Sequence, residues 1–179
     1  MSTLSISVAV GLLIILHDAW FYWTHRLLHL GPMFRFHRLH HRSVAPTVWT
    51  AYSFHPIEAF IHALFPVAMS PFVPLSIEVI GSFMTFMVVR NALGHSGVEV
   101  FPADRKREPL LAWSTTVTHH DLHHELGRGN YGLYFTFWDR VMKTETPRYV
   151  EYFQRALRSR TFSQKETASF SEQMNLRQS

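Results

Sequence analysis

The sequence predicts an all-α integral membrane protein with a histidine-rich helical cap, and three observations lead to this prediction. The chain of 179 residues is only 17% charged and 47% hydrophobic, whereas soluble domains carry roughly 25% charged residues. Its apolar residues gather in long stretches, and its 13 histidines recur at helical spacings. A chain of this length forms a single domain. The absence of cysteine excludes disulfides, zinc ribbons, iron–sulfur clusters and thiol catalysis.

Three apolar stretches are expected to lie in the membrane. Residues 4–23 would form a helix of about 30 Å, long enough to cross the hydrocarbon core. No basic residue precedes this stretch and no small-residue cleavage site follows it, which argues against a signal peptide. Residues 56–75 and 76–93 are predicted to form a helical hairpin, because the two prolines between them end one helix and start the next. The most apolar parts of its arms, 57–69 and 77–89, have 13 residues each, so the hairpin is expected to be shallow.

The distribution of basic residues places the histidines on the cytoplasmic side. All 17 Lys and Arg lie in two zones, one from Arg26 to Arg42 and one from Arg90 onward. One crossing followed by a hairpin puts both zones on the same side, which the positive-inside rule makes cytoplasmic. The net charge of +4 therefore reflects membrane topology, and no basic stripe with interleaved aromatics indicates nucleic-acid binding. The alternative is a soluble helical protein with a very apolar core.

The spacing of the histidines predicts a site for two metal ions. His25 and His29 lie side by side on one helix, and the pattern His-x-x-His-His occurs twice. Positions i, i+3 and i+4 share one helical face, so three imidazoles are expected to converge in each copy. These eight imidazoles exceed the four ligands of a structural zinc site and suit two ions, and an all-nitrogen ligand set suits iron, zinc or copper. His95 is expected to be a ninth ligand, the alternative being a hydrogen-bonded structural histidine. The predicted ligands are then His25, His29, His37, His40, His41, His95, His120, His123 and His124.

Several other polar residues are expected to support these ligands. Asp18 and Asp121 are natural acceptors for the outward ring N–H of a ligating histidine, the alternative being that each caps or solvates its own helix. His55 is expected to be a ligand or to support one. Glu58 and His62 are predicted to line a pocket or support the site, because ionisable groups in an apolar arm face a protein interior or a wet cavity. The predicted supporting residues next to the ligands are Asp18, His55, His119 and Asp121.

These motifs resemble those of the fatty acid hydroxylase/sterol desaturase superfamily of membrane di-iron enzymes. The resemblance runs from about Asp18 to Thr144. It implies that the nine histidines hold two irons on the cytoplasmic face of a membrane-embedded helical base. The matching motifs are Asp18-x-x-x-Tyr22-Trp23-x-His25-Arg26-x-x-His29, His37-x-x-His40-His41, His55-Pro56-x-Glu58, His95-Ser96-Gly97, His119-His120-Asp121-x-His123-His124, Asn130-Tyr131-Gly132 and Trp138-Asp139.

The resemblance implies an O2-dependent oxidoreductase that hydroxylates or desaturates an unactivated C–H bond of a lipid, such as a sterol or a fatty acyl chain. O2 is then the co-substrate, and two Fe ions are the cofactor, with Zn as a possible occupant in purified protein. The chain lacks a Gly-x-Gly-x-x-Gly nucleotide motif, so a b-type cytochrome, ferredoxin or reductase is expected to supply electrons. The alternative is a zinc- or iron-binding membrane protein without oxygenase activity, whose site is structural or binds a lipid head group. A metal transporter is disfavoured, because the histidine clusters flank the apolar arms.

The sequence also departs from the superfamily in places. Many members carry an additional membrane helix before the first motif, whereas 17 residues precede Asp18, so a short form or part of a longer chain is expected. Glu99 stands where some fatty acyl hydroxylases carry a second histidine, which argues against a fatty-acyl substrate in particular. Residues 110–125 are expected to be helical. Residues 1–146 are predicted to form the catalytic domain and residues 147–179 a polar tail, mobile from residue 161.

Overall fold

The computed structural model describes residues 2–159, and this part of the chain is helical without a β-strand. The all-α prediction is confirmed. Three short 3-10 turns lie between the first and third α-helices, and residues 149–159 are also helical. The elements are α1 (Thr3–Leu28), η1 (Gly31–Met33), α2 (Phe34–His37), η2 (His40–Arg42), η3 (Thr50–Tyr52), α3 (Pro56–Met69), α4 (Ile77–Gly94), α5 (Val117–Leu126) and α6 (Phe137–Val141).

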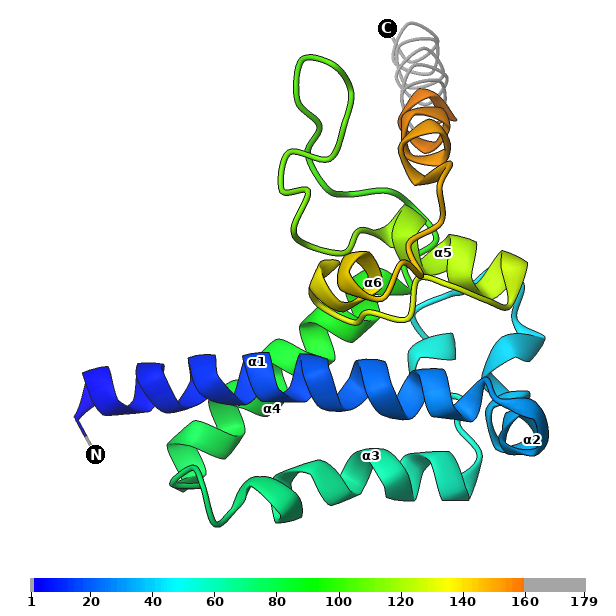
Figure 1. Ribbon diagram of the computed structural model, residues 1–179. Helices are drawn as coiled ribbons and strands as arrows, with labels where there is room; N and C mark the ends of the chain where they lie inside the picture. The colour runs from blue at the N-terminus through cyan, green and yellow to red at the C-terminus, as the bar shows by residue number, and fades with distance from the viewer. Residues whose placement is uncertain (1, 160–179) are drawn as a thin grey trace, which may run out of the picture.

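Helices α1, α3 and α4 form what we call the base. The hairpin of α3 and α4 packs along α1 (Figure 1), and a buried apolar cluster that includes Leu13, Phe65 and Phe83 joins the three helices. By length and composition, α1 and α4 could each cross a membrane, whereas α3 is a shorter apolar helix of 14 residues. The first arm of the predicted hairpin ends earlier than expected, at Met69, because Pro71 lacks the N–H that would continue the helix.

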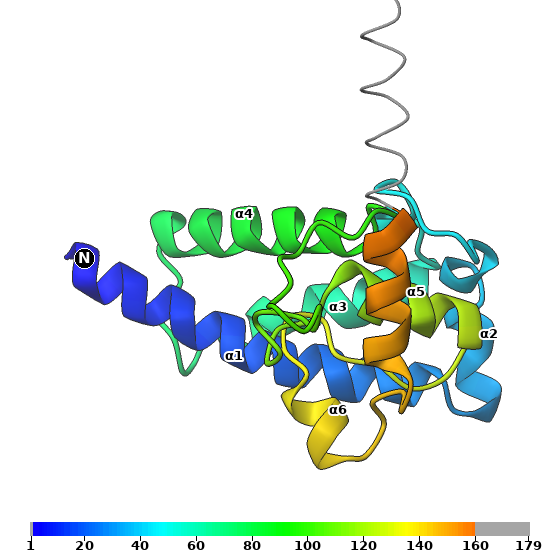
Figure 2. The same cartoon turned by 90° about the horizontal axis from the view of Figure 1, so that it is seen from above.

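Residues 29–55 and 95–159 form what we call the cap. In both views α2 and α5 lie at the end of the base where α1 finishes (Figures 1 and 2). The segment after α5 returns to α1, where Asp18 accepts hydrogen bonds from the backbone N–H groups of Tyr134 and Phe135. The Tyr134 hydroxyl pairs with Nδ1 of His17 at 2.9 Å. These bonds attach the cap to the side of the base.

Two predicted helical stretches are shorter in the structure. Helix α5 begins only after Thr116, whose side chain accepts the His119 N–H as an N-cap. It ends at Gly127, which adopts the left-handed conformation with φ 64°. Residues 110–116 are instead a loop, in which Ser114 pairs with Phe135. The first His-x-x-His-His motif is also interrupted, because α2 ends at His37 and η2 begins at His40.

The helical residues 149–159 pack on the cap. Tyr149 and Phe153 are buried against Leu122 of α5. The domain boundary at residue 146 stays a prediction, but this contact shows that side chains beyond it belong to the packed part of the chain. The mobile segment predicted from residue 161 lies outside the described residues.

Candidate metal centre

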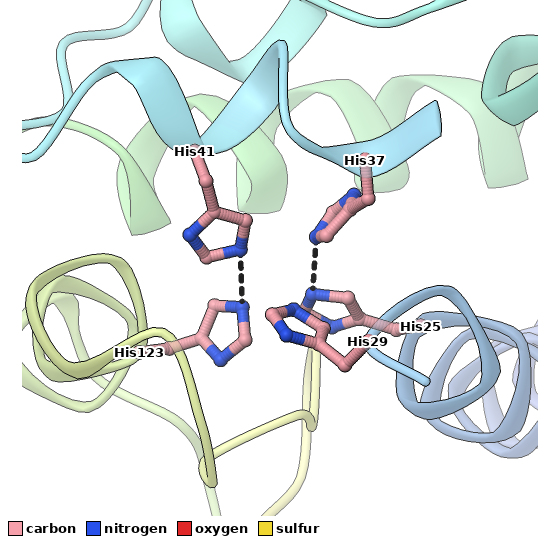
Figure 3. Close-up of side chains that lie close together, drawn as sticks. All are labelled: His25, His29, His37, His41 and His123. Atoms are coloured by element: carbon pink, nitrogen blue, oxygen red, sulfur yellow. Dashed lines mark hydrogen bonds between the residues drawn. The ribbon is translucent and has the colours of Figure 1, made fainter. Parts of the chain in front are cut away.

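Nine histidines form two adjacent groups, each of which has the ligands to hold one metal ion. Within each group the potential ligand nitrogens all lie within 4.8 Å of one another. Figure 3 shows the first group, in which rings from α1, from the segment around α2 and η2, and from α5 point toward one another. All nine are histidines that the sequence predicts as ligands. The first group is His25, His29, His37, His41 and His123, and the second is His40, His95, His120 and His124.

Each His-x-x-His-His motif divides between the two groups. In α5 the first and last histidines, His120 and His124, belong to the second group, and His123 belongs to the first. In a helix with about 3.6 residues per turn, the side chains at i+3 and i+4 are rotated about the helix axis in opposite senses relative to the side chain at i. Neighbouring rings therefore reach two separate points, which corrects the expectation that all three converge on one. The first motif divides in the same way, with His37 and His41 apart from His40.

Ring nitrogens from different segments face each other at short distances. In the first group, Nε2 of His25 lies 3.0 Å from Nε2 of His37, and the dashed lines in Figure 3 mark this pair and the His41–His123 pair. In the second group, Nε2 of His120 lies 2.9 Å from that of His95 and 3.2 Å from that of His124. Two nitrogens bound to one ion at about 2.1 Å stand roughly 3.0–3.4 Å apart. The distances between the Nε2 atoms within each group therefore match those of nitrogens that bind the same ion.

Hydrogen bonds at the outer ring nitrogens fix the protonation of four of these rings. In each, Nδ1 donates to a backbone carbonyl, which can only accept, so Nδ1 carries the proton and the neutral ring presents a lone pair at Nε2. Lone pairs that face each other at about 3 Å repel unless a cation lies between them. The donor set therefore fits a metal ion. The four pairs are His25 with Tyr131 (3.0 Å), His95 with Asn91 (2.8 Å), His123 with Gly129 (2.7 Å) and His124 with Ser43 (3.0 Å).

His37 differs from these four rings because its Nδ1 donates to a carboxylate. The acceptor is Oε1 of Glu58, at 2.6 Å, and Glu58 is fully buried. The same oxygen lies 3.9 Å from Nε2 of His62. A carboxylate behind a ligating histidine orients the ring and raises its basicity. Glu58 thus has the geometry that the sequence analysis expected of Asp18 and Asp121, and its place in an apolar arm was the signal for a supporting role.

Asp18 and His55 lie outside both histidine groups. Asp18 is buried, but its bonds go to the backbone of the cap segment described above rather than to a predicted ligand. His55 is the N-cap of α3, and its Nδ1 accepts the N–H of Ile57 at 3.2 Å. Both residues hold the backbone in place, which corrects the expectation that they contact the ligands.

Asp121 and His119 also lie outside the two groups, although both are on α5. Oδ1 of Asp121 has no hydrogen-bond partner in the described part of the chain, and burial together with repulsion from Glu99 raises its pKa to about 7. His119 is fully buried on the side of α5 that faces Asp139, with 3.7 Å between its Nε2 and the carboxylate. Their expected contact with a ligating ring is therefore corrected as well.

Burial keeps three rings of the histidine groups, those of His41, His95 and His124, neutral. It lowers the pKa of His41 and of His95 to about 4. It also lowers the pKa of His124 to about 3, with repulsion from His41 and His95 as further causes. The neutral imidazole is the form that binds metal. These rings therefore need to release no proton at pH 7 before they coordinate an ion.

A buried carboxylate, Asp139, fixes the loop whose backbone carbonyls accept hydrogen bonds from His25 and His123. It accepts hydrogen bonds from the backbone N–H groups of Tyr131 at 2.9 Å and Gly132 at 2.8 Å, and from the Thr144 hydroxyl at 2.7 Å. The amide of Asn130 donates to the His119 carbonyl. Asn130, Tyr131, Gly132 and Asp139 match motifs of the superfamily, but the sequence alone indicates no role for them. Their role is to place the carbonyls behind His25 and His123.

Replacing Gly132 by alanine is expected to destabilise this loop. A Cβ there would lie 2.5 Å from the Phe135 carbonyl oxygen and 2.9 Å from Oδ2 of Asp139. Overpacking of this kind costs about 1–3 kcal/mol, which a thermal unfolding measurement detects. Gly81→Ala is the matched control, because no atom lies within 4 Å of that Cβ position. Equal unfolding temperatures for the two variants would contradict the role given to the loop.

Residues 10–144 match the family model described as fatty acid hydroxylase. This chain belongs to the fatty acid hydroxylase family. The resemblance drawn from the motifs is confirmed. No solved structure gives a significant match to this family member.

Several curated relatives of this fatty acid hydroxylase family member carry the names of sterol enzymes. The C-4 methylsterol oxidase erg25 of Schizosaccharomyces pombe is 32% identical over 76% of this chain and 46% of its own length. Human lathosterol oxidase is 35% identical over 69% of the chain and 40% of its own length. The Delta(7)-sterol 5(6)-desaturase erg3B of Aspergillus fumigatus is 31% identical over 67% and 34%. The chain thus spans less than half the length of these relatives.

Proposed function

We propose that this chain is a membrane oxidoreductase that hydroxylates or desaturates an unactivated C–H bond of a lipid, with a sterol or a related amphiphile as substrate. The observation that carries the proposal is the gathering of nine histidines into two adjacent groups with their ring nitrogens turned inward. The printed names of its relatives, sterol oxidases and desaturases, support both the reaction and the substrate class. We assign the catalytic domain to residues 1–146.

The nine histidines are proposed to hold two iron ions, one in each group. Iron in this position would supply the activation of O2 that oxidation of an unactivated C–H bond requires. The rings of His41, in the first group, and His124, in the second, stack at a centroid distance of 4.7 Å, so the two groups are in direct contact. The carbonyls behind four rings and Glu58 behind His37 orient the ligands before an ion binds. The chain itself therefore supplies a preformed site.

The base is proposed to lie in the membrane with the cap on the cytoplasmic side. Only 22% of the most apolar stretch of α1 and 11% of that of α4 is buried, whereas the core helix of a soluble protein is mostly buried. The Lys and Arg residues lie in two zones. The first runs from Arg26, near the end of α1, to Arg42, and the second starts at Arg90, near the end of α4. The positive-inside rule then places the cap in the cytoplasm.

A lipid substrate and an electron donor complete the proposal. The apolar body of an amphiphile would remain beside the base while its reacting carbon meets the histidine groups at the end of the base. The basic residues of the cap suit an acidic electron donor, such as a b-type cytochrome, a ferredoxin or a reductase.

Aerobic turnover by the full chain in lipid vesicles tests the proposed function. Iron-loaded protein with a chemical reductant is expected to consume O2 and to convert added sterol to a hydroxylated or desaturated product, detected by mass spectrometry. Zinc-loaded protein is the control and is expected to be inactive, because zinc has no redox chemistry. A chain that binds two irons but consumes no O2 with any lipid class would contradict an oxygenase and favour a non-catalytic metal protein.

A further inference from the structure

The exposed tryptophan and tyrosine side chains of residues 2–159 gather where the cap meets the base. Trp49 is 83% exposed, Trp113 58%, Tyr52 51% and Trp23 45%. The exposed surface of α3 and α4 further from the cap is different, since it presents aliphatic side chains such as Val67 and phenylalanines such as Phe60. Trp and Tyr have an apolar body and a polar edge, and they are enriched where a bilayer meets water.

Three of these residues lie at the same level of helix α4. The Tyr52 hydroxyl donates to the Val88 carbonyl at 3.4 Å, which places the turn containing Trp49 and Tyr52 beside the last part of α4. The segment that follows Trp113 lies at that level too, because Arg90 donates to the Thr115 carbonyl at 3.2 Å. Segments from two distant parts of the sequence therefore present aromatic side chains at one height.

These exposed aromatic side chains form a band, and helix α6 connects Trp23 to it. The Trp23 ring contacts that of Trp138 at a centroid distance of 5.7 Å, and the neighbouring Phe137 is 59% exposed. The backbone N–H of Thr136 donates to the Trp113 carbonyl at 2.9 Å, so α6 connects Trp23 with Trp113. The band therefore extends from α1 across α6 to the loop beside α4.

Cations accompany the band on its cap side. The Arg26 guanidinium lies 5.9 Å from the centroid of the Trp23 ring. The exposed Arg140, whose Nε also pairs with Glu145 at 3.3 Å, donates to the Ala112 carbonyl at 2.7 Å, directly next to Trp113. No Lys or Arg occurs between Ser43 and Val89, the part of the chain that contains α3 and most of α4. Guanidinium groups suit the phosphates of lipid headgroups, so charge and aromatic character point to the same partner.

We propose that Trp23, Trp49, Tyr52 and Trp113 form an aromatic belt that lies at the headgroup level of a phospholipid bilayer. The inference rests on the proposed membrane location and adds how deeply the chain lies in the bilayer. The belt places the cap face formed by η3, α6 and residues 110–113 on the membrane surface. Because the ring of Phe54, two positions after Tyr52, stacks on that of His40 at a centroid distance of 5.3 Å, the histidine groups then lie close above the lipid headgroups.

Site-directed spin labelling tests the belt in the intact chain, which contains no native cysteine. Single variants Trp49→Cys and Trp113→Cys are labelled with a nitroxide in vesicles of phosphatidylcholine and phosphatidylglycerol. The accessibility of each label to O2, which concentrates in lipid, is compared with that to a water-soluble nickel chelate. Val67→Cys on α3 and Val150→Cys on the helical residues 149–159 are the references for the apolar arm and the cap, and both native side chains are exposed. Metal content reports whether each variant is folded.

The two belt labels are expected to give accessibility ratios between those of the two references. Labels at residues 49 and 113 that match Val150→Cys would overturn the belt and leave the membrane location intact, provided that Val67→Cys is accessible to O2. Labels that match Val67→Cys would also overturn it, because both side chains would lie too deep. If Val67→Cys itself is reached by the nickel chelate, the proposed membrane location fails, and the belt fails with it.

Discussion

Alanine at position 120 is expected to lower the metal content of the chain from two ions to one and to abolish lipid oxidation. The Nε2 atom of His120 lies 2.9 Å from that of His95 and 3.2 Å from that of His124, so it lies close to two other members of the second group. Loss of a residue that merely supports a ligand costs about 10–100-fold in metal affinity or activity. Removal of a ligand itself is expected to cost more than this, and elemental analysis and product formation measure both effects.

His55→Ala is the matched control for this variant. His55 is another histidine of the cap, but it belongs to neither group and caps helix α3. Its replacement is expected to cost about 1 kcal/mol of stability, as for loss of an N-cap, and to leave two ions bound. If His120→Ala kept two tightly bound ions, or if His55→Ala lost one, the assignment of the second group would be contradicted.

Alanine in place of Glu58 is expected to weaken metal binding in the first group by about 10–100-fold. Glu58 is the carboxylate that accepts the Nδ1–H of His37, at 2.6 Å. Its removal leaves that N–H buried without an acceptor and frees the ring to rotate. Glu58→Gln keeps an acceptor oxygen and is expected to lose less. A competition titration against a chelator measures the affinity of the two ions separately.

Glu78→Gln is the control for the change in charge. Glu78 also lies in the first turn of an apolar helix, but it is exposed and outside both histidine groups. It is expected to leave both affinities unchanged. Wild-type affinity for both ions in Glu58→Ala would show that the carboxylate has no part in holding His37.

The members of the two histidine groups could be predicted from the sequence because their pattern is local. Pairs such as His25 and His29, or His120 and His124, are neighbours on a helix at a spacing of four residues, and this spacing needs no knowledge of the fold. The positions of the long apolar helices follow from the same kind of local evidence. Which histidines belong to the same group depends on tertiary packing, because His41 and His123 are 82 positions apart in the chain.

The acceptors behind the rings were predicted less well. Four are backbone carbonyls, which every residue possesses and which therefore leave no signature in the sequence. Asp18 and Asp121 stand near predicted ligands in the sequence, whereas the carboxylate that reaches a ring, Glu58, comes from α3. The stretch 110–116 is rich enough in apolar residues to suggest helix, but it forms a loop with Trp113 at the surface.

The proposed oxidation depends on two metal ions held by the nine histidines. Iron analysis of the intact chain purified from iron-supplied cells, combined with X-ray absorption at the iron edge, measures both the number of ions and their ligands. We expect two irons per chain with a coordination sphere dominated by imidazole nitrogens at roughly 2.0–2.2 Å, as for imidazole bound to a first-row metal. A folded chain that retains one iron or none and binds no other metal in its place would rule out the proposed two-metal site.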